Sequence, residues 1–211
     1  MTELQQKLAR PKCRKLLATF GKNDFIIDDE SYFTLSHTTL SGNDRFYLSK
    51  TPNSIKNKYI AKHEQKILVY LAISPLGISR PIFSKSGLAI NQISYKENCL
   101  KPSLVPFIRK YYARRKYVFW PDLASSHYAH SVQDFLTNAK IPFVPKLLNP
   151  ANVPKARPIE DFWAHLKQQV YMGGWCANSV EQLKEKIDLK FVQQLAMGTR
   201  KRLNHISRYA L

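Results

Sequence analysis

Hydrophobic residues along the chain form short continuous runs of the kind found in strands buried within a sheet. The segment Phe25–Leu35 combines β-branched and aromatic residues on both sides of an acidic cluster, and Ile67–Ile73 is apolar throughout. A third run, Tyr117–Trp120, ends at a proline. Continuous apolar runs are typical of strands covered on both faces. These three runs predict the central strands of a sheet.

Shorter segments predict further strands around this centre. Turn residues at Pro75–Gly77 lead toward a partner strand around Arg80–Phe83, which gives an antiparallel meander. Ile141–Val144 follows a helical pattern, so it predicts a parallel strand reached by a crossover. The polar stretch Ser41–Lys66 predicts a long loop with a short strand at Arg45–Leu48.

Apolar residues spaced three and four apart predict three main helices. The first lies between Ser94 and Tyr112, although Pro102 and Pro106 disfavour a regular first half. The third begins at Pro158, a residue type suited to the first helical position. The three apolar stripes are Leu100, Leu104, Phe107, Ile108 and Tyr111; Val132, Phe135, Leu136 and Ala139; and Ile159, Phe162, Trp163, Leu166 and Val170.

The two ends of the chain differ in character from its middle. The first 23 residues are basic and predict a lead-in or linker remnant that is helical at most in part. Near the other end, Ser179 and Gln182 form a plausible capping box that starts a final helix or helix pair. We therefore divide the chain into a lead-in at 1–23, a single large domain at 24–171 and a C-terminal helical extension at 172–211.

The charge balance of the chain changes the picture from a generic α/β domain to one with a polyanionic partner. Lys and Arg number 33 against 15 Asp and Glu, a formal net charge of +18 with a pI of about 9.9. Nucleic acid is the first partner that such a balance indicates. The bland alternative is a generally basic soluble protein, because charge informs about binding and solubility and not about fold.

The absence of certain features from the sequence indicates where in the cell the protein is located. The longest wholly apolar run is Ile67–Ile73, far shorter than the roughly 20 residues that a membrane-spanning helix needs. The first fifteen residues hold no secretory apolar stretch, and three widely spaced cysteines suggest neither a disulfide framework nor a zinc site. We expect an intracellular protein without a membrane partner, located in the nucleus if it binds eukaryotic DNA.

Three acids stand out by their positions in the predicted elements. Asp29 lies in the middle of the first strand, Asp122 follows the strand Tyr117–Trp120, and Glu160 lies in the first turn of a helix. Carboxylates are the ligands that hard divalent cations prefer, and two such cations can activate water and stabilise a leaving oxygen in phosphodiester cleavage. Taken singly, each acid also has an ordinary explanation as a turn, an exposed edge or a helix-dipole partner.

The sequence around the three acids resembles the motifs of mariner-type transposases of the Tc/mariner superfamily. The motifs are Ile27-Asp-Asp-Glu-Ser-Tyr-Phe33, Ile67-Leu-Val-Tyr-Leu-Ala-Ile-Ser74, Phe119-Trp-Pro-Asp-Leu-Ala-Ser-Ser-His127 and Pro158-Ile-Glu-Asp-Phe-Trp-Ala-His-Leu-Lys167. Between Asp122 and Glu160 lie 37 residues, a length typical of this superfamily. The resemblance covers about residues 24 to 171. The chain departs from the family at Leu123, where an Asn is most common.

This resemblance implies a ribonuclease-H-like α/β fold, a mixed five-stranded sheet with three antiparallel strands followed by parallel ones, flanked by helices. It implies a DDE catalytic centre in which Asp29, Asp122 and Glu160 hold two Mg(II) or Mn(II) ions. The activity it implies is endonuclease cleavage at transposon ends, followed by transfer of the 3′ hydroxyl into target DNA. Family members usually carry, before the core, helix-turn-helix modules that recognise the transposon ends. This chain has no room for such modules, so we expect no recognition of specific ends from these residues. The resemblance leaves open whether the protein forms a homodimer.

Basic and aromatic residues near the motifs are candidates for contacts with DNA. His127 resembles the family histidine after the second Asp, and its role is either to orient phosphate or water or to cap a helix. Trp163 and Phe162 are interpreted as core rather than as base-stacking groups, because they lie on an apolar face. The predicted phosphate-binding residues are Lys155, Arg157, Lys110, Arg114 and Arg115. For Lys155 and Arg157, a solvated basic loop is an equally good interpretation.

Two rival functions remain beside the active transposase. A catalytically silent or domesticated copy would retain only DNA binding, and the intact acid triad weighs against it without excluding it. A nuclease or retroviral-type integrase with the same fold is disfavoured by Asp29-Glu30-Ser31 and Pro158-Ile159-Glu160.

Overall fold

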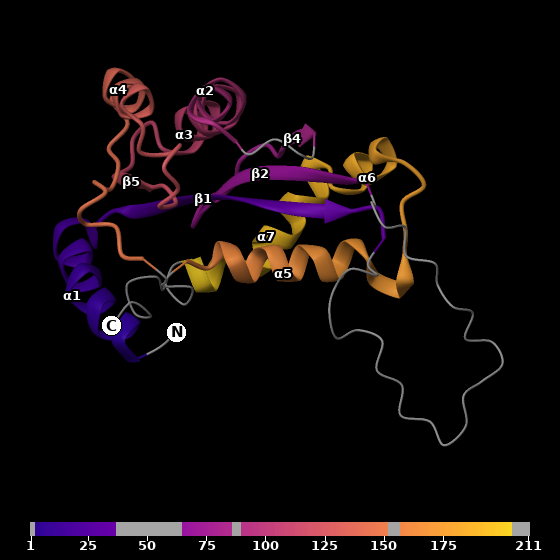
Figure 1. The fold of residues 1–211 in the computed structure, drawn as a ribbon, viewed down its shortest axis with the longest axis horizontal. Helices are drawn as coiled ribbons and strands as arrows, with labels where there is room; N and C mark the ends of the chain where they lie inside the picture. Colours follow the sequence, from indigo (N-terminus) through magenta and orange to yellow (C-terminus); the bar gives the residue numbers. More distant parts are fainter. Residues whose placement is uncertain (1–2, 37–64, 86–89, 152–156, 204–211) are drawn as a thin grey trace.

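The sheet in the computed structural model is built from the runs that the hydrophobic pattern indicates (Figure 1). The structure describes residues 3–36, 65–85, 90–151 and 157–203, so the short strand predicted at Arg45–Leu48 lies outside the described residues. The strands are β1 (Asp24–Thr34), β2 (Lys66–Ser74), β3 (Gly77–Ile78), β4 (Ile82–Lys85) and β5 (Tyr117–Trp120). Their order is β3-β2-β1-β5, and β4 also pairs with β2.

The sheet is mixed, as predicted. β1 pairs antiparallel with β2, from Ile27 opposite Ile73 to Thr34 opposite Lys66. β3 and β4 both pair antiparallel with β2, while β5 pairs parallel with β1. Eight of the nine residues of β2 are buried, which confirms a strand covered on both faces.

One predicted strand, Ile141–Val144, is reduced to a single parallel bridge between Phe119 and Phe143. The main-chain bonds at this bridge run from Phe119 N–H to Pro142 O and from Val144 N–H to Phe119 O, each 2.8 Å long. Pro142 has no N–H, so the ladder cannot extend. The predicted crossover is nevertheless parallel.

The helices lie on both faces of the sheet, and strand alternation separates two cores (Figure 1). In β1, Ile27 points into one core and Ile26 into the other. The first core contains side chains from α1 (Glu3–Phe20), α5 (Ile159–Val170), α6 (Val180–Lys186) and α7 (Leu189–Leu203). The second contains side chains from η1 (Tyr95–Leu104), α3 (Val105–Tyr111) and α4 (His130–Asn138), and α2 (Gln92–Ser94) precedes η1.

The lead-in was predicted to be helical at most in part, and this was wrong, because α1 runs continuously from Glu3 to Phe20. Ala9, Cys13 and Leu16 recur at spacings of four and three and are buried in the first core. The high charge of the segment hid this narrow apolar stripe. Side chains from all three predicted segments of the chain share the first core, including Leu183 and Val192 of the C-terminal helices.

The predicted helix between Ser94 and Tyr112 is present, but its middle is wound as a π-helix, η1. Pro102 lies inside this segment, where it cannot donate to the preceding turn. The N–H of Val105 bonds to the carbonyl of Leu100, the five-residue spacing of a π-helix. The part of the helix that contains Pro102 is therefore wound irregularly, whereas Pro106 lies at the start of the regular helix α3.

The start of α6 confirms half of the predicted capping box. The hydroxyl of Ser179 accepts a bond of 3.1 Å from the N–H of Gln182, as expected. The side chain of Gln182 instead accepts from the N–H of Asn178, at 2.6 Å. Elsewhere α5 begins at Ile159, one residue after Pro158, and the 3₁₀ turn η3 (Met172–Gly174) follows it. Within the described residues, no helix is long and apolar enough to cross a membrane.

Candidate active site

Asp29 and Asp122 lie at the same edge of the sheet because β1 and β5 run parallel. The register ends with Ile27 opposite Trp120, and the two acids each follow two residues later. Their charges interact, since Asp122 raises the pKa of Asp29. The fold therefore brings these two predicted site residues together across a gap of 92 residues in the sequence.

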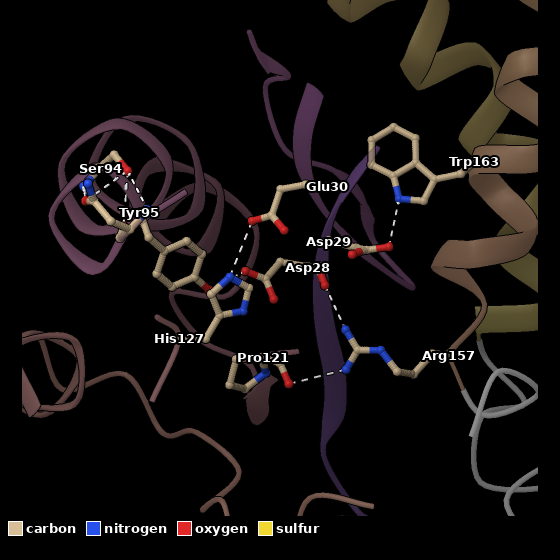
Figure 2. A network of polar contacts seen from close by, with 10 residues as sticks. Asp28, Asp29, Glu30, Ser94, Tyr95, Pro121, His127, Arg157 and Trp163 are labelled. Atoms are coloured by element: carbon tan, nitrogen blue, oxygen red, sulfur yellow. Dashed lines mark hydrogen bonds and ion pairs between the residues drawn. The ribbon is translucent and has the colours of Figure 1, made fainter. Parts of the chain in front are cut away.

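The carboxyl group of Asp29 is partly buried and held by a side chain of α5 (Figure 2). Trp163 donates its indole N–H to Oδ2 of Asp29 over 3.1 Å. Burial raises the pKa of Asp29 to about 6, and the charges of Glu30 and Asp122 add to this. The peptide N–H of Glu30 and the charge of Arg157 act in the opposite direction. Asp29 is thus an oriented carboxylate whose charge is only partly compensated by its surroundings.

Within the described residues, Glu160 does not join this pair in a three-residue group that could hold a metal ion. It is exposed in the first turn of α5, one turn before Trp163. Within residues 3–36, 65–85, 90–151 and 157–203, no three His, Cys, Asp or Glu side chains lie close enough to hold one metal ion. The structure therefore brings together two of the three predicted ligands and sets the helix of the third beside Asp29.

The Asp29–Asp122 pair fits a hard divalent cation. Burial raises the pKa of Asp29 and the charge of Asp122 adds to this, so the charged form of Asp29 is disfavoured there. A cation with a preference for oxygen ligands would stabilise that charged form.

The other face of β1 carries a second polar cluster, formed by Asp28, Glu30, Tyr95 and His127 (Figure 2). Asp28 is fully buried and accepts a hydrogen bond from the hydroxyl of Tyr95. Nε2 of His127 lies 3.4 Å from Oε1 of Glu30, and the imidazole stacks on the Tyr95 ring with centroids 3.9 Å apart. The helix-capping role left open for His127 does not fit, because α4 begins after Ala129.

Burial and mutual charge set the protonation of this cluster. Burial raises the pKa of Asp28 to about 6, although the charge of His127 and the bond from Tyr95 lower it. Burial opposes the charged form of His127, but the bond to Glu30 and the charge of Asp28 outweigh it and raise the histidine pKa. Asp28 and His127 therefore form a buried, coupled pair behind the predicted metal ligand.

Replacing Asp28 with asparagine should flatten the pH dependence of stability below neutrality. A carboxyl group with a raised pKa in the folded state stabilises the protein below about pH 4, and this contribution is lost as the pH rises through 6. The difference between the ordinary pKa of an aspartate and the pKa of about 6 in the folded protein corresponds to about 3 kcal/mol. Urea unfolding of both proteins in chelator, from pH 4 to 7, measures the difference.

The matched control for this experiment is Asp134→Asn on the exposed surface of α4, which makes the same change of charge. Its unfolding free energy should follow the parent at every pH. A parent and an Asp28→Asn variant with parallel curves would mean that Asp28 does not titrate abnormally.

The predicted phosphate-binding residues are scattered by the fold. Lys110, Arg114 and Arg115 are exposed, but they precede β5, whereas Asp122 follows it. Four strand residues, at roughly 3.3 Å each, therefore separate that basic group from the acids. Lys155 lies outside the described residues. Arg157 is only 7% exposed and donates to main-chain carbonyls, a setting different from the solvated loop or phosphate contact that we expected.

Some residues of the site were not assigned these roles from the sequence. The motifs point to Asp29 and indicate no role for its neighbour Asp28, for Tyr95 or for Lys167, and the apolar spacing predicts Trp163 as core alone. Strand alternation would have placed Asp28 and Asp29 on opposite faces. Lys167 is partly buried on α5, where its lowered pKa reflects burial opposed by the charge of Asp29.

A pocket of about 670 Å³ opens beside the second polar cluster. Its walls include Glu30 and Tyr32 of β1 and His127. Asn91 and Ser126 also line it, from the start of α2 and the loop after β5. The pocket is therefore lined by residues that come shortly after the two acids in the chain, Glu30 after Asp29 and Ser126 after Asp122.

Comparison with known proteins identifies the fold. No protein-family model matches the chain, and no curated protein matches its sequence. The Mos1 transposase paired-end complex with the left transposon end superposes with a TM-score of 0.70 at 16% identity, over 100% of this chain and 63% of that one. The catalytic domain of Mos1 mariner transposase gives 0.62 at 15% identity, over 100% and 95% of the two chains.

The share of each Mos1 chain that is covered shows which part of the Mos1 transposase is similar to this chain. The chain spans less than two thirds of the Mos1 transposase in the paired-end complex but nearly all of the separate catalytic domain. The Mos1 mariner paired-end complex with Mn is similar too, with a TM-score of 0.63 at 17% identity over 64% of its length. The chain therefore has the ribonuclease-H-like fold of the mariner transposase catalytic domain, as its motifs predicted.

Proposed function

We propose that this chain is the catalytic core of a mariner-type DDE transposase, which cuts DNA at transposon ends and transfers the 3′ hydroxyl into target DNA. The observation that carries the proposal is the juxtaposition of Asp29 and Asp122 across the parallel pair β1 and β5. The fold shared with the Mos1 catalytic domain supports it. We place its activity in the nucleus, and we predict that the chain can form a homodimer.

Two Mg(II) or Mn(II) ions are the proposed cofactors, held by Asp29, Asp122 and Glu160. Mos1 structures with Mn and with Mg support this choice. Such ions lower the pKa of bound water and compensate the charge that develops on the leaving oxygen. The protein's own contribution is orientation, because the indole N–H of Trp163 holds one oxygen of Asp29.

The DNA partner is proposed from charge and from the DNA-containing Mos1 complexes. Lys167 is partly buried on α5 and its charge interacts with Asp29, so it is the candidate for a phosphate near the cut. Lys110, Arg114 and Arg115 would bind the duplex farther away.

Replacing Lys110, Arg114 and Arg115 together with glutamine should weaken DNA binding and its dependence on salt. Each phosphate contact contributes a slope of about 0.9 in the plot of log affinity against log salt concentration. We therefore expect a slope shallower by up to about 2.7, measured by fluorescence anisotropy with duplex DNA. The control triple changes the same net charge on the exposed face of α1, at Lys12, Arg14 and Lys15. Equal slopes for both triples would refute a local DNA contact.

Nicking of supercoiled DNA and strand transfer of a 3′ end test the proposed function directly. We expect both activities with Mg(II) or Mn(II) and neither with a chelator. A chain that binds DNA but neither nicks nor joins it under any of these conditions would support the alternative, a catalytically silent or domesticated copy. The observation that favours this alternative is that Glu160 is exposed and, in the described part of the chain, forms no three-residue metal-binding group with the other two acids.

A further inference from the structure

Arg157 lies where the pairing of β1 with β5 stops (Figure 2). The parallel register ends at Ile27 opposite Trp120, and the next residue of the β5 segment is Pro121, which has no N–H to extend the ladder. Arg157 donates from Nη2 to the carbonyl of Asp28 over 2.8 Å and from Nη1 to the carbonyl of Pro121 over 3.3 Å. The guanidinium group of Arg157 therefore links β1 to the segment after β5 at a point where backbone hydrogen bonds cannot link them.

The carbonyl of Asp28 faces this gap because of its pairing with β2. Asp28 lies opposite Ala72, and both main-chain groups of Ala72 bond to Ser79 on the far side, at 2.9 and 2.8 Å. Residue pairs in an antiparallel ladder alternate between bonded and non-bonded, so the main chain of Asp28 points away from β2 and toward β5. A buried carbonyl in that position needs a donor, which Arg157 provides.

The chemistry of arginine suits this task. Its planar guanidinium carries five donors in a fixed fork, whereas lysine offers a single flexible ammonium group. The group also lies over the Trp120 ring, with its central carbon 5.6 Å from the ring centroid. The contacts with two carbonyls and a buried ring hold the guanidinium in one orientation.

We propose that Arg157 is a positioning residue that sets the spacing between the carboxylates of Asp29 and Asp122 by tying together the backbones that carry them. Asp29 and Asp122 directly follow the two carbonyls that Arg157 binds. The consequence for catalysis rests on the proposed function. A displacement of about 1 Å at a reacting centre can lower a rate about 100-fold. Loss of the hydrogen bonds from Arg157 should therefore lower the rate of the reaction at the site.

The test uses Arg157→Lys and Arg157→Gln in the full chain, with Arg80→Lys at an exposed position as the matched control. Mn(II) binding is measured by electron paramagnetic resonance without DNA, DNA binding by anisotropy across salt concentrations, and nicking with Mg(II). We expect both Arg157 variants to bind Mn(II) at least about tenfold more weakly. They should nick about 100-fold more slowly. DNA affinity and its salt slope should stay at the parental values.

Two outcomes would overturn the proposal. Parental Mn(II) affinity in Arg157→Lys would show that the fork does not set the spacing, and a weaker, less salt-dependent DNA affinity would make Arg157 a phosphate contact instead. A parent that binds Mn(II) without nicking DNA refutes the proposed function and leaves the ion-binding comparison valid. If circular dichroism shows that Arg157→Gln is unfolded, Arg157→Lys decides alone.

Discussion

Replacing Asp122 with asparagine should abolish metal-dependent nicking and strand transfer while leaving the fold and DNA binding intact. Asparagine keeps the size of the side chain but removes the charge that faces Asp29 across the ends of β1 and β5. Even residues that only support metal ligands cost about 10- to 100-fold when mutated, so loss of a ligand should cost at least about 100-fold. Initial nicking rates with Mg(II) measure the effect.

The control for this experiment is again Asp134→Asn, which removes an exposed carboxylate on α4. It should nick DNA at the parental rate. Activity that survives in Asp122→Asn at the parental rate would remove the metal mechanism, whatever the fold.

Trp120→Ala should lower the free energy of unfolding by about 3 to 5 kcal/mol, the range typical of large aromatic deletions in a core. The side chain is fully buried and packs on Phe25, with ring centroids 5.4 Å apart. Its indole N–H donates to Oδ1 of Asn149 over 2.8 Å. Asn149 in turn donates to the carbonyl of Pro121, so the deletion also loosens the segment that carries Asp122.

Urea unfolding of a phenylalanine variant separates packing from hydrogen bonding. Trp120→Phe keeps most of the buried ring but leaves the buried Asn149 oxygen without this donor, a loss of about 1 to 3 kcal/mol. Leu147→Ala, at a side chain that is 86% exposed, should change the unfolding free energy by less than about 0.5 kcal/mol. A Trp120→Ala protein as stable as the Leu147→Ala control would contradict the central place of Trp120 in the core.

Much of the sheet could be predicted because several of its strands contain continuous runs of apolar residues. Ile67–Ile73 and Tyr117–Trp120 each lie within an observed strand, β2 and β5. The strand expected at Ile141–Val144 failed because proline removes a donor, an effect that hydrophobicity does not report. The helix α1 was missed for the opposite reason, since charged residues surround a stripe of only a few apolar positions.

The candidate site was predictable only in part. Asp29 and Asp122 were identified by motif and by strand position, and the parallel pairing of β1 with β5 brings them together. The role of Arg157 was not predictable, because the carbonyls that it binds belong to residues 129 and 36 positions away. The same holds for Trp163, whose apolar spacing predicts core and does not reveal that its N–H reaches Asp29.

The sequence by itself determined the kind of sheet, the apolar faces of the main helices and the choice of candidate acids, because these depend on patterns within short segments. Only the tertiary structure decided which acids meet and what holds them. Asp28 and Asp29 are adjacent in the chain, yet one lies in a buried cluster with Tyr95 and the other faces Trp163. Contacts of this kind join distant segments, so they follow from packing and not from any local periodicity.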